Sequence, residues 1–329
     1  MTNLPFIKLN RNVLTKKQSE TSDKFGCDPY NRPVKELLNY GIINIDKPKG
    51  PTSHQVTAYA KDILGLKKAG HSGTLDPKVT GVLPTAIGRG TRIVQTLLIA
   101  GKEYVCLMHL HKKVDKDKIK QVMNNFLGVI DQLPPVKSAV KRRLRQRTIY
   151  YLDVLDIKDQ DVLFKVGCEA GTYIRKLCHD IGLQLNTGAH MAELRRTKVA
   201  TFSEDTLVTM NDIKDSFWYF NNENNEKFIR HVIKPIEVAV DHLPKVWVLD
   251  TSVNSLCHGA SLKIPGISKL HDNIEVDDMV AVMTLKNELV CIGNAKITSK
   301  HMFKRNRGLA VTINKVFMLP GIYPRIENK

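Results

Sequence analysis

A single carboxylate, Asp76, lies in a segment whose composition is suited to presenting a reactive group. Residues 70–81 read Gly-His-Ser-Gly-Thr-Leu-Asp-Pro-Lys-Val-Thr-Gly. The glycines allow backbone conformations that other residues avoid, and Pro77 fixes its own φ and biases Asp76 towards an extended conformation. We therefore predict a rigid loop, neither helix nor regular strand, that displays the carboxylate. The alternative is an Asx-type turn, in which the carboxylate accepts hydrogen bonds from nearby backbone NH groups.

A second candidate for chemistry is the pair Tyr173 and Arg175, which follows Gly171-Thr172 at the predicted start of a helix. Residues two apart on a helix point in different directions, so the tyrosine can stack on a ligand while the arginine pairs with an acid. The alternative reading is structural, with the tyrosine in the core and the arginine on the solvent face. The pattern alone does not choose between the two.

A third candidate is a basic segment, residues 137–147, which carries six cations and no acid. It directly follows Leu133-Pro134-Pro135, and this composition predicts an exposed loop. Cations in such a loop can neutralise phosphates without reading bases, so we expect Lys141, Arg142, Arg143 and Arg145 to contact substrate RNA or a regulatory subunit. A solvated charged loop without a specific partner is the alternative.

The overall charge also favours a nucleic acid as partner. The 329 residues include 50 Lys and Arg against 33 Asp and Glu, for a net charge of +17, and such an excess attracts polyanions. A membrane is not expected, because the longest apolar run, around residues 93–100, is far shorter than the roughly 18 residues needed to cross a bilayer. The first 24 residues lack the apolar stretch of a signal peptide. We therefore expect a cytoplasmic protein.

The six cysteines are scattered along the chain without a CxxC pair. This spacing argues against a disulfide framework and against a zinc site, and it indicates a reducing compartment. We expect no metal.

The remaining segments alternate between strand and helix patterns, which predicts the α+β class with a mixed, mainly antiparallel sheet and flanking helices. Strands are expected from Gly41, at residues 103–111, 148–157 and 161–168. Helices are expected from Thr52 or Ser53 to about Leu64, at 91–100, at 173–185, and between Asp115 as cap and Gly128 as terminator. This last helix has an apolar face of Ile119, Val122, Met123, Phe126 and Leu127.

Two other regions differ from this pattern. From Lys245 the chain is rich in short strands, at residues 246–249, 279–285, 289–297 and 309–318, with a hairpin turn at 286–288, and we predict a small β-barrel there. The polar insert at residues 221–226 is predicted to be an exposed loop. The first 30 or so residues are read either as a flexible tail or as a strand that docks elsewhere.

Several of these motifs together resemble the TruB/dyskerin family of pseudouridine synthases in order and spacing. They are residues 70–81, Lys102-Glu103-Tyr104, the segment from Gly171 to Asp180, His190-Met-Ala-Glu-Leu-Arg-Arg, and Lys47-Pro48 with the Gly-Pro-Thr-Ser that follows at 50–53. The resemblance covers about residues 37–237, and residues 245–324 resemble a PUA domain. It implies a basic N-terminal extension at 1–36, a catalytic domain at 37–244 and a PUA-like RNA-binding domain at 245–324.

The resemblance implies that the chain isomerises uridine in RNA to pseudouridine. The bond between N1 and C1′ breaks, the base turns while it is retained, and it rejoins the sugar through C5. This reaction needs a carboxylate near C1′ and C2′ and a pocket for an extruded base, and it requires no redox step, metal or other cofactor. In the family Asp76 is that carboxylate, and the nearby cation Arg175 favours its ionised form. Attack on C1′ and removal of the C2′ proton both stay open as its role.

Further roles follow from the same resemblance. Tyr173 stacks on the flipped base, and Tyr104 handles the C5 proton, although an ordinary phenol with a pKa near ~10 is a poor base without help from its surroundings. Lys47, His71 and Leu194 line the site. Leu194 is alternatively a core residue, and His71 alternatively orients the loop.

Ser72, Thr74 and residues 176–180 resemble the archaeal and eukaryotic branch of the family, and the end of the chain at 324–329 resembles the archaeal form. The implied partners are a box H/ACA guide RNA, substrate rRNA or tRNA, and the small proteins of the H/ACA ribonucleoprotein. Guide-independent action on the T-loop of tRNA is the alternative.

Three other classes compete with this reading. A glycoside hydrolase needs a second carboxylate, and a metal-dependent nuclease needs clustered acids, and the Asp76 segment offers neither. A non-catalytic RNA-binding scaffold stays open, because the basic loop and the β-rich C-terminal region suit it equally.

Overall fold

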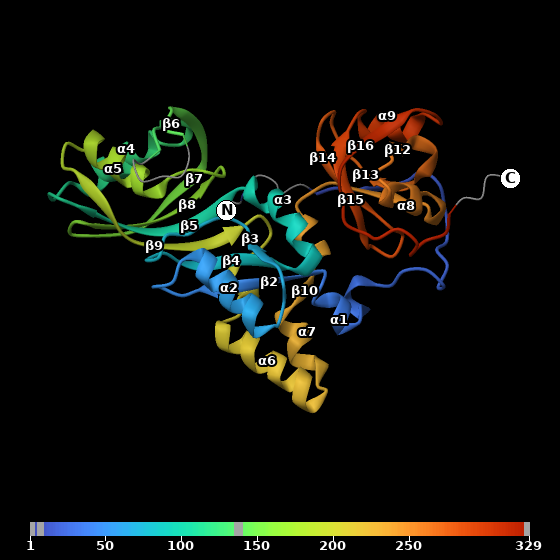
Figure 1. The fold of residues 1–329 in the computed structure, drawn as a ribbon. Helices are drawn as coiled ribbons and strands as arrows, with labels where there is room; N and C mark the ends of the chain where they lie inside the picture. The colour runs from blue at the N-terminus through green and yellow to red at the C-terminus, as the bar shows by residue number, and fades with distance from the viewer. Residues whose placement is uncertain (1–3, 5–9, 135–140, 326–329) are drawn as a thin grey trace. The chain divides into compact units, whose positions relative to one another are not determined.

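The computed structural model describes residue 4, residues 10–134 and residues 141–325 (Figure 1). The chain forms two compact units. The first is built mainly from residues 43–85 and 94–218, and the second mainly from residues 10–42, residues 86–93 and the chain from Tyr219 onward. Helices combine with mixed sheets, which confirms the predicted α+β class. The boundaries at residues 37 and 245 stay a prediction.

The first unit is organised around a mixed sheet with strand order β2-β4-β9-β5-β8-β7-β6, and β3 pairs with β4. The strands are β2 (Gly41–Lys47), β3 (Ala69–His71), β4 (Thr80–Ile87), β5 (Lys102–Leu110), β6 (Gly128–Gln132), β7 (Arg145–Lys158), β8 (Asp161–Cys168) and β9 (Ala189–Val199). The strand pairs from β9 to β6 are antiparallel, whereas β4 and β9 run parallel. The strands predicted from Gly41 and at 103–111, 148–157 and 161–168 are therefore confirmed.

The helices of this unit begin where the sequence places capping residues. Helix α2 (Ser53–Ile63) has Thr52 as its N-cap, and the Thr52 and Gln55 side chains form a capping box. Asp115 caps α4 (Lys116–Asn124) and accepts from two backbone NH groups. Helix α5 (Ile174–Gln184) starts directly after Tyr173, as predicted.

Two of the predicted helices end differently. The helix expected at 91–100 is a 3-10 helix, η3 (Gly88–Ile93), followed by the short helix α3 (Val94–Leu98). Helix α4 stops at Asn124 rather than near Gly128, which instead opens β6 with a φ of +87°. Because the helix has already ended, Leu127 is 44% exposed and does not share the apolar face.

The core of the first unit lies between the sheet and helices α4 and α5, which Figure 1 shows beside β6, β7 and β8. Ile119 and Met123 of α4 and Leu177 and Ile181 of α5 are fully buried against strand residues such as Phe164. Burial of such side chains stabilises by roughly 1.5–3 kcal/mol each. The packing therefore fixes the start of α5, which carries Tyr173 and Arg175, relative to β5.

The second unit contains a sheet with strand order β1-β13-β11-β14-β15-β16-β12. Its strands are β1 (Val13–Thr15), β11 (Lys245–Val248), β12 (Leu262–Lys263), β13 (Ile267–His271), β14 (Met279–Met283), β15 (Leu289–Ala295) and β16 (Leu309–Val316), accompanied by helices α8 (Asp250–Cys257) and α9 (Ser299–Lys304). The predicted hairpin turn between β14 and β15 is confirmed, with Asn287 at a φ of +66°. The N-terminal segment is a docked strand, because β1 pairs antiparallel with β13.

The prediction of an exposed loop at residues 221–226 was wrong. Helix α6 (Met210–Glu223) runs into this segment, and α7 (Glu226–Val232) begins at its last residue. Asn224 has a φ of +51°, and the Asn225 side chain caps α7 by accepting from the Lys227 backbone NH. Asparagine favours both roles, so the polar composition marks a short break between two helices rather than a loop.

The chain also contains α1 (Val34–Leu37), β10 (Lys234–Pro235) and the 3-10 helices η2 (Pro29–Asn31), η4 (Glu204–Thr206), η5 (Ile236–Val240) and η6 (Ile264–Gly266).

Candidate active site

Asp76 lies in the loop between β3 and β4, and this loop is held by hydrogen bonds at both sides of the aspartate. On one side, the Ser53 hydroxyl at the start of α2 accepts from the Leu75 backbone NH at 2.8 Å and donates to the Leu75 carbonyl. On the other, the Val79 backbone NH donates to the Asp76 carbonyl at 2.9 Å, which closes a turn with Pro77 at its second position. The predicted fixed loop is therefore confirmed for residues 72–79, whereas Gly70-His71 belongs to β3 and Thr80-Gly81 to β4.

The Asp76 carboxylate forms an ion pair with Arg175, which connects Asp76 Oδ2 to Arg175 Nη2. It does not serve as the cap of an Asx turn in its own loop. The two side chains are 52% and 58% exposed, respectively, so the pair stays accessible to a large ligand. A charge-assisted hydrogen bond of this kind aims the carboxylate. The fold thus brings Asp76 and Arg175 together as expected, although they lie 99 positions apart in the chain.

Lys47 supports the loop of Asp76. Its side chain is fully buried, and Nζ donates to the carbonyls of Pro48 at 2.9 Å, Pro77 at 3.2 Å and Val79 at 2.9 Å. All three ammonium donors are therefore used by the backbone, two of them by the loop of Asp76. Burial lowers the pKa of Lys47, and the charge of Asp76 opposes this shift. Contact of Lys47 with a substrate stays a prediction.

His71 also acts on the loop. Its Nδ1 accepts from the Gly73 backbone NH at 3.3 Å, and its ring packs edge-on against His54 with 4.8 Å between centroids. Burial, together with the charges of the nearby His54 and Arg196, lowers the pKa of His71 to about 4. These contacts support the alternative in which His71 orients the loop.

This shift predicts how stability depends on pH. As pH falls, the unfolded chain protonates His71 near its ordinary pKa of about 6.5, but the folded protein does so only near 4. The unfolded state binds more protons in this window, so the free energy of unfolding should fall as pH drops from about 6.5 to 4, by at most about 1.4 kcal/mol per pH unit from this one site. Urea unfolding of His71→Gln should show a smaller pH slope than the wild type. An identical slope would contradict the assignment.

Tyr104 lies near the start of β5 and is only 9% exposed. Burial raises the pKa of its phenol, and Arg196 opposes this shift through its charge and a hydrogen bond. Leu194 on β9 is half-buried, packs against the same apolar core and pairs across the strands with Cys106. This packing supports the core alternative for Leu194, and contact of Leu194 with a substrate stays a prediction.

Tyr173 is half-buried at the N-cap of α5, and its backbone is held by Gln132 at the end of β6. The Gln132 amide nitrogen donates to the Tyr173 carbonyl at 3.2 Å, and the Gln132 amide oxygen accepts from the Tyr173 NH at 2.9 Å. Gln132 is only 1% exposed. This clamp fixes the position from which the tyrosine ring and Arg175 project.

The basic loop is exposed where the structure describes it. Lys141, Arg142 and Arg143 are exposed, whereas Arg145 is half-buried. Its guanidinium reaches back to the Lys141 carbonyl at 3.5 Å. Lys137 lies outside the described residues. The exposure is compatible with the expected phosphate contacts, which stay a prediction.

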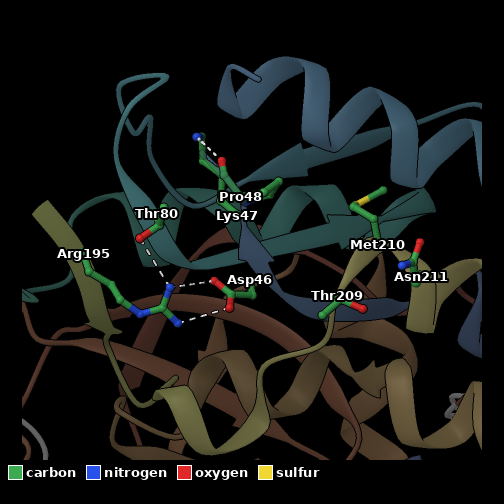
Figure 2. Close-up of a pocket in the computed structure, with 8 residues that line it drawn as sticks. All are labelled: Asp46, Lys47, Pro48, Thr80, Arg195, Thr209, Met210 and Asn211. Atoms are coloured by element: carbon green, nitrogen blue, oxygen red, sulfur yellow. Dashed lines mark hydrogen bonds and ion pairs between the residues drawn. The ribbon is translucent and has the colours of Figure 1, made fainter. Parts of the chain in front are cut away.

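A separate pocket is shown in Figure 2. Its lining consists of Asp46, Lys47, Pro48, Thr80, Arg195, Thr209, Met210 and Asn211. Arg195 binds both oxygens of Asp46, at 3.0 and 3.1 Å, and also Glu204 at 2.6 Å. Asp76, Tyr104 and Arg175 are not among the lining residues, so this pocket is not the place where the predicted chemistry would occur.

Comparison with known proteins decides the family. Residues 61–174 match the TruB family pseudouridylate synthase N-terminal domain, and residues 175–241 match the tRNA pseudouridylate synthase B C-terminal domain. A relative from Pyrococcus horikoshii named "Probable tRNA pseudouridine synthase B" is 55% identical over 320 residues, covering 97% of this chain and 96% of the relative. The chain belongs to the TruB family of pseudouridine synthases. Residues 244–317 match a PUA domain and residues 2–57 a DKCLD (NUC011) domain.

Solved structures of TruB-family proteins agree with this assignment. The fold is similar to a chain in a structure described as a Cbf5-Nop10-Gar1 complex, with 53% identity, 99% coverage of each chain and a TM-score of 0.94. It is also similar to a chain in an H/ACA ribonucleoprotein bound to a substrate RNA containing 2′-deoxyuridine, with 51% identity, coverage of 98% and 99%, and a TM-score of 0.92. The chain is therefore an RNA pseudouridine synthase with a PUA domain.

Within the described ranges, no helix has the length and apolar character needed to span a membrane.

Three residues that hold this pseudouridine synthase site together were not singled out from the sequence. Ser53 was noted only as a helix cap, and Gln132 sits in a strand that was not predicted. Arg196 carries a signal that was not used. It lies two residues after Leu194 in a strand, so both side chains share one face, and Leu194 was already expected at the site.

Proposed function

We propose that this pseudouridine synthase is the catalytic subunit of a box H/ACA ribonucleoprotein that modifies rRNA in the cytoplasm. The support is similarity along the whole chain, at 51–53% identity, to proteins whose structures are described as a Cbf5-Nop10-Gar1 complex and an H/ACA ribonucleoprotein with substrate RNA. A guide RNA would select the uridine by base pairing, while the protein binds the RNA backbone and shape. Small protein subunits complete the particle.

The exposed pair of Asp76 and Arg175 is the observation on which the chemistry rests. We infer that Asp76 acts at C1′ or C2′ of the extruded uridine while Arg175 holds it ionised and aimed. Tyr173 stacks on the base, a contact worth about 1–3 kcal/mol. Tyr104, which is directly across from Arg196, handles the C5 proton. Lys47, His71 and Gln132 keep these groups in place through the backbone contacts described above.

A second candidate is guide-independent action on the T-loop of tRNA. The support is that archaeal relatives with 52–55% identity are named probable tRNA pseudouridine synthase B. The two candidates share one active site and differ in how the substrate is selected.

One experiment separates them. The purified protein is incubated with an rRNA fragment or a tRNA transcript, with and without a matching H/ACA guide and the small subunits, and nucleosides are analysed by chromatography with mass detection. Guide-directed function predicts pseudouridine at the rRNA uridine opposite the guide pocket, only when the guide is present. Product in tRNA alone, unaffected by the guide, would favour the second candidate. No product in any mixture would reject both.

The basic loop should contribute to RNA affinity through phosphate contacts. Reversing the charge of Lys141, Arg142, Arg143 and Arg145 to glutamate should weaken binding and reduce the salt slope of the binding constant by about 0.7–0.9 for each lost contact. Filter binding across a salt series measures both.

The matched control reverses the same amount of charge on another exposed set, Lys112, Lys116, Lys118 and Lys120, in and just before α4. If the two variants lose affinity and salt slope equally, the loop contributes only to the general positive charge of the protein.

A further inference from the structure

Arg196 on β9 is a buried cation without a carboxylate partner. It is 1% exposed, Nε donates to the Val82 carbonyl at 2.8 Å, and Nη2 donates to the Gly73 carbonyl at 3.2 Å. Both of these partners are neutral carbonyls, and among the residues that the structure describes no acid lies within ion-pair distance of Arg196. Its cross-strand neighbour is Tyr104, and the charge of Arg196 acts to lower the pKa of the Tyr104 phenol.

The strands are built to bring Arg196 to this position. Tyr104 on β5 and Arg196 on β9 are direct cross-strand partners, and Gly81 on β4 pairs with Arg196 from the other side. A Cβ atom at Gly81 would lie 2.2 Å from the Arg196 carbonyl oxygen, and Gly81 has a φ of +102°. Only glycine allows β4 to approach the backbone of residue 196 so closely, and this approach holds β9 in place beside β4.

Stability does not account for a charge at this place. Burying an ion without an opposite charge costs several kcal/mol, and a hydrophobic residue of similar volume often serves the fold as well or better. The same side of β5 also carries Lys102, which is 5% exposed and donates to the carbonyls of Leu97, Leu98 and Ala100. Burial and the charge of Arg196 lower the pKa of Lys102 to about 7. Burial raises the pKa of the Tyr104 phenol, and the charge of Arg196 opposes this rise.

We propose that Arg196 is a positioning residue for the isomerisation, which acts through the Tyr104 hydroxyl by orienting it and stabilising negative charge on its oxygen. The inference rests on the proposed role of Tyr104. Nη2 of the same guanidinium donates to the Gly73 carbonyl, so Arg196 also contacts the loop of Asp76. One buried side chain thus helps to position both Asp76, which acts on the sugar, and Tyr104, which acts on the base.

The chemistry gives Arg196 a defined task. Once C5 of the uracil has joined C1′, C5 still bears its hydrogen. The phenolate of Tyr104 takes this proton, the electron pair of the C5–H bond restores the ring double bond, and N1 gains a proton from water, so the base remains an isomer. Tyr104 then returns its proton to water. A neutral phenol is a poor acceptor, and an adjacent guanidinium lowers the free energy of the phenolate.

The test is a double-mutant cycle in the assembled enzyme with guide, small subunits and substrate RNA. Single-turnover rates are measured for wild type, Arg196→Lys, Tyr104→Phe and the double variant, each corrected for its folded fraction from urea unfolding. We expect Arg196→Lys to lower the rate about tenfold or more with Tyr104 present, and much less in the Tyr104→Phe background. Equal factors in both backgrounds would mean a purely structural role and would overturn the proposal.

A second measurement is made on protein that keeps Arg196, so it does not depend on whether an Arg196 variant folds. In wild-type protein with ¹³Cζ-labelled tyrosines, assigned with Tyr104→Phe, the pH at which Tyr104 ionises is compared with that of Tyr151. Tyr151 is a matched control, because its hydroxyl donates to the buried Glu103 carboxylate. Tyr104 should ionise at the lower pH, and the reverse order would refute the proposal. If wild type forms no pseudouridine at all, the proposed function fails instead.

Discussion

Asp76→Asn should lose pseudouridine formation by about 10⁴-fold or more, while its affinity for RNA changes little. The asparagine keeps the size and the loop contacts of Asp76, which come from Ser53, Lys47 and the Val79 backbone rather than from the carboxylate itself. It removes the negative charge that acts on the sugar. Losses of this size are typical when the reacting side chain of an enzyme is removed. Single-turnover kinetics and filter binding measure the two effects.

The chain offers a matched control in a second ion pair on helix α5, between Lys176 and Asp180. Asp180→Asn makes the same chemical change at a carboxylate that does not contact the Asp76 loop, and it should retain wild-type activity. If Asp76→Asn kept a rate within tenfold of wild type, Asp76 would not be the reacting group. If it lost RNA binding as well, its role would be in binding.

Arg175→Met should lower the rate by about 10²-fold with the RNA still bound. The substitution removes the ion-pair partner of the Asp76 carboxylate, so the carboxylate is no longer aimed, and misplacement by about 1 Å is enough for such a loss. Arg175→Lys should fall between Arg175→Met and wild type, because it keeps the charge but not the planar guanidinium. Rates under single turnover with saturating enzyme measure this.

Lys176→Met, one residue further along α5, removes the same charge and breaks the pair with Asp180 instead. It should reduce the rate less than threefold. A comparable loss in both variants would show that the total positive charge of α5 matters, rather than the contact with Asp76.

The features that the sequence predicted correctly depend on local signals. The loop of Asp76 follows from its glycines and Pro77, and the start of α2 follows from Thr52 and its capping partner. These signals act over a few residues and can be read without knowing the rest of the chain. The pairing of Asp76 with Arg175 came instead from the resemblance to a family, since no local pattern connects residues 99 positions apart.

The features that were missed depend on contacts between distant segments. Gln132 binds Tyr173 across 41 positions, and Arg196 binds Gly73 across 123. Nothing near Gln132 distinguishes it from an ordinary polar surface residue. Arg196 is marked only by its spacing from Leu194, which does not reveal its contact with Gly73. The contacts of Lys47 were also not predictable from the sequence. Its motif was recognised, but only the fold shows that its ammonium group donates to three backbone carbonyls. The short break at Asn224 and Asn225 was misjudged because the same residue type favours loops, helix ends and helix caps.

The most direct test of the account follows the hydrogen at C5 of the target uridine. Wild-type enzyme, with guide and small subunits, is given substrate RNA labelled with tritium at C5, and tritium released to water is counted alongside pseudouridine. Isomerisation through Asp76 predicts one tritium released for each pseudouridine formed, and none released by Asp76→Asn. Stable binding of the RNA by the wild type without any release of tritium would contradict the assignment of this site to uridine isomerisation.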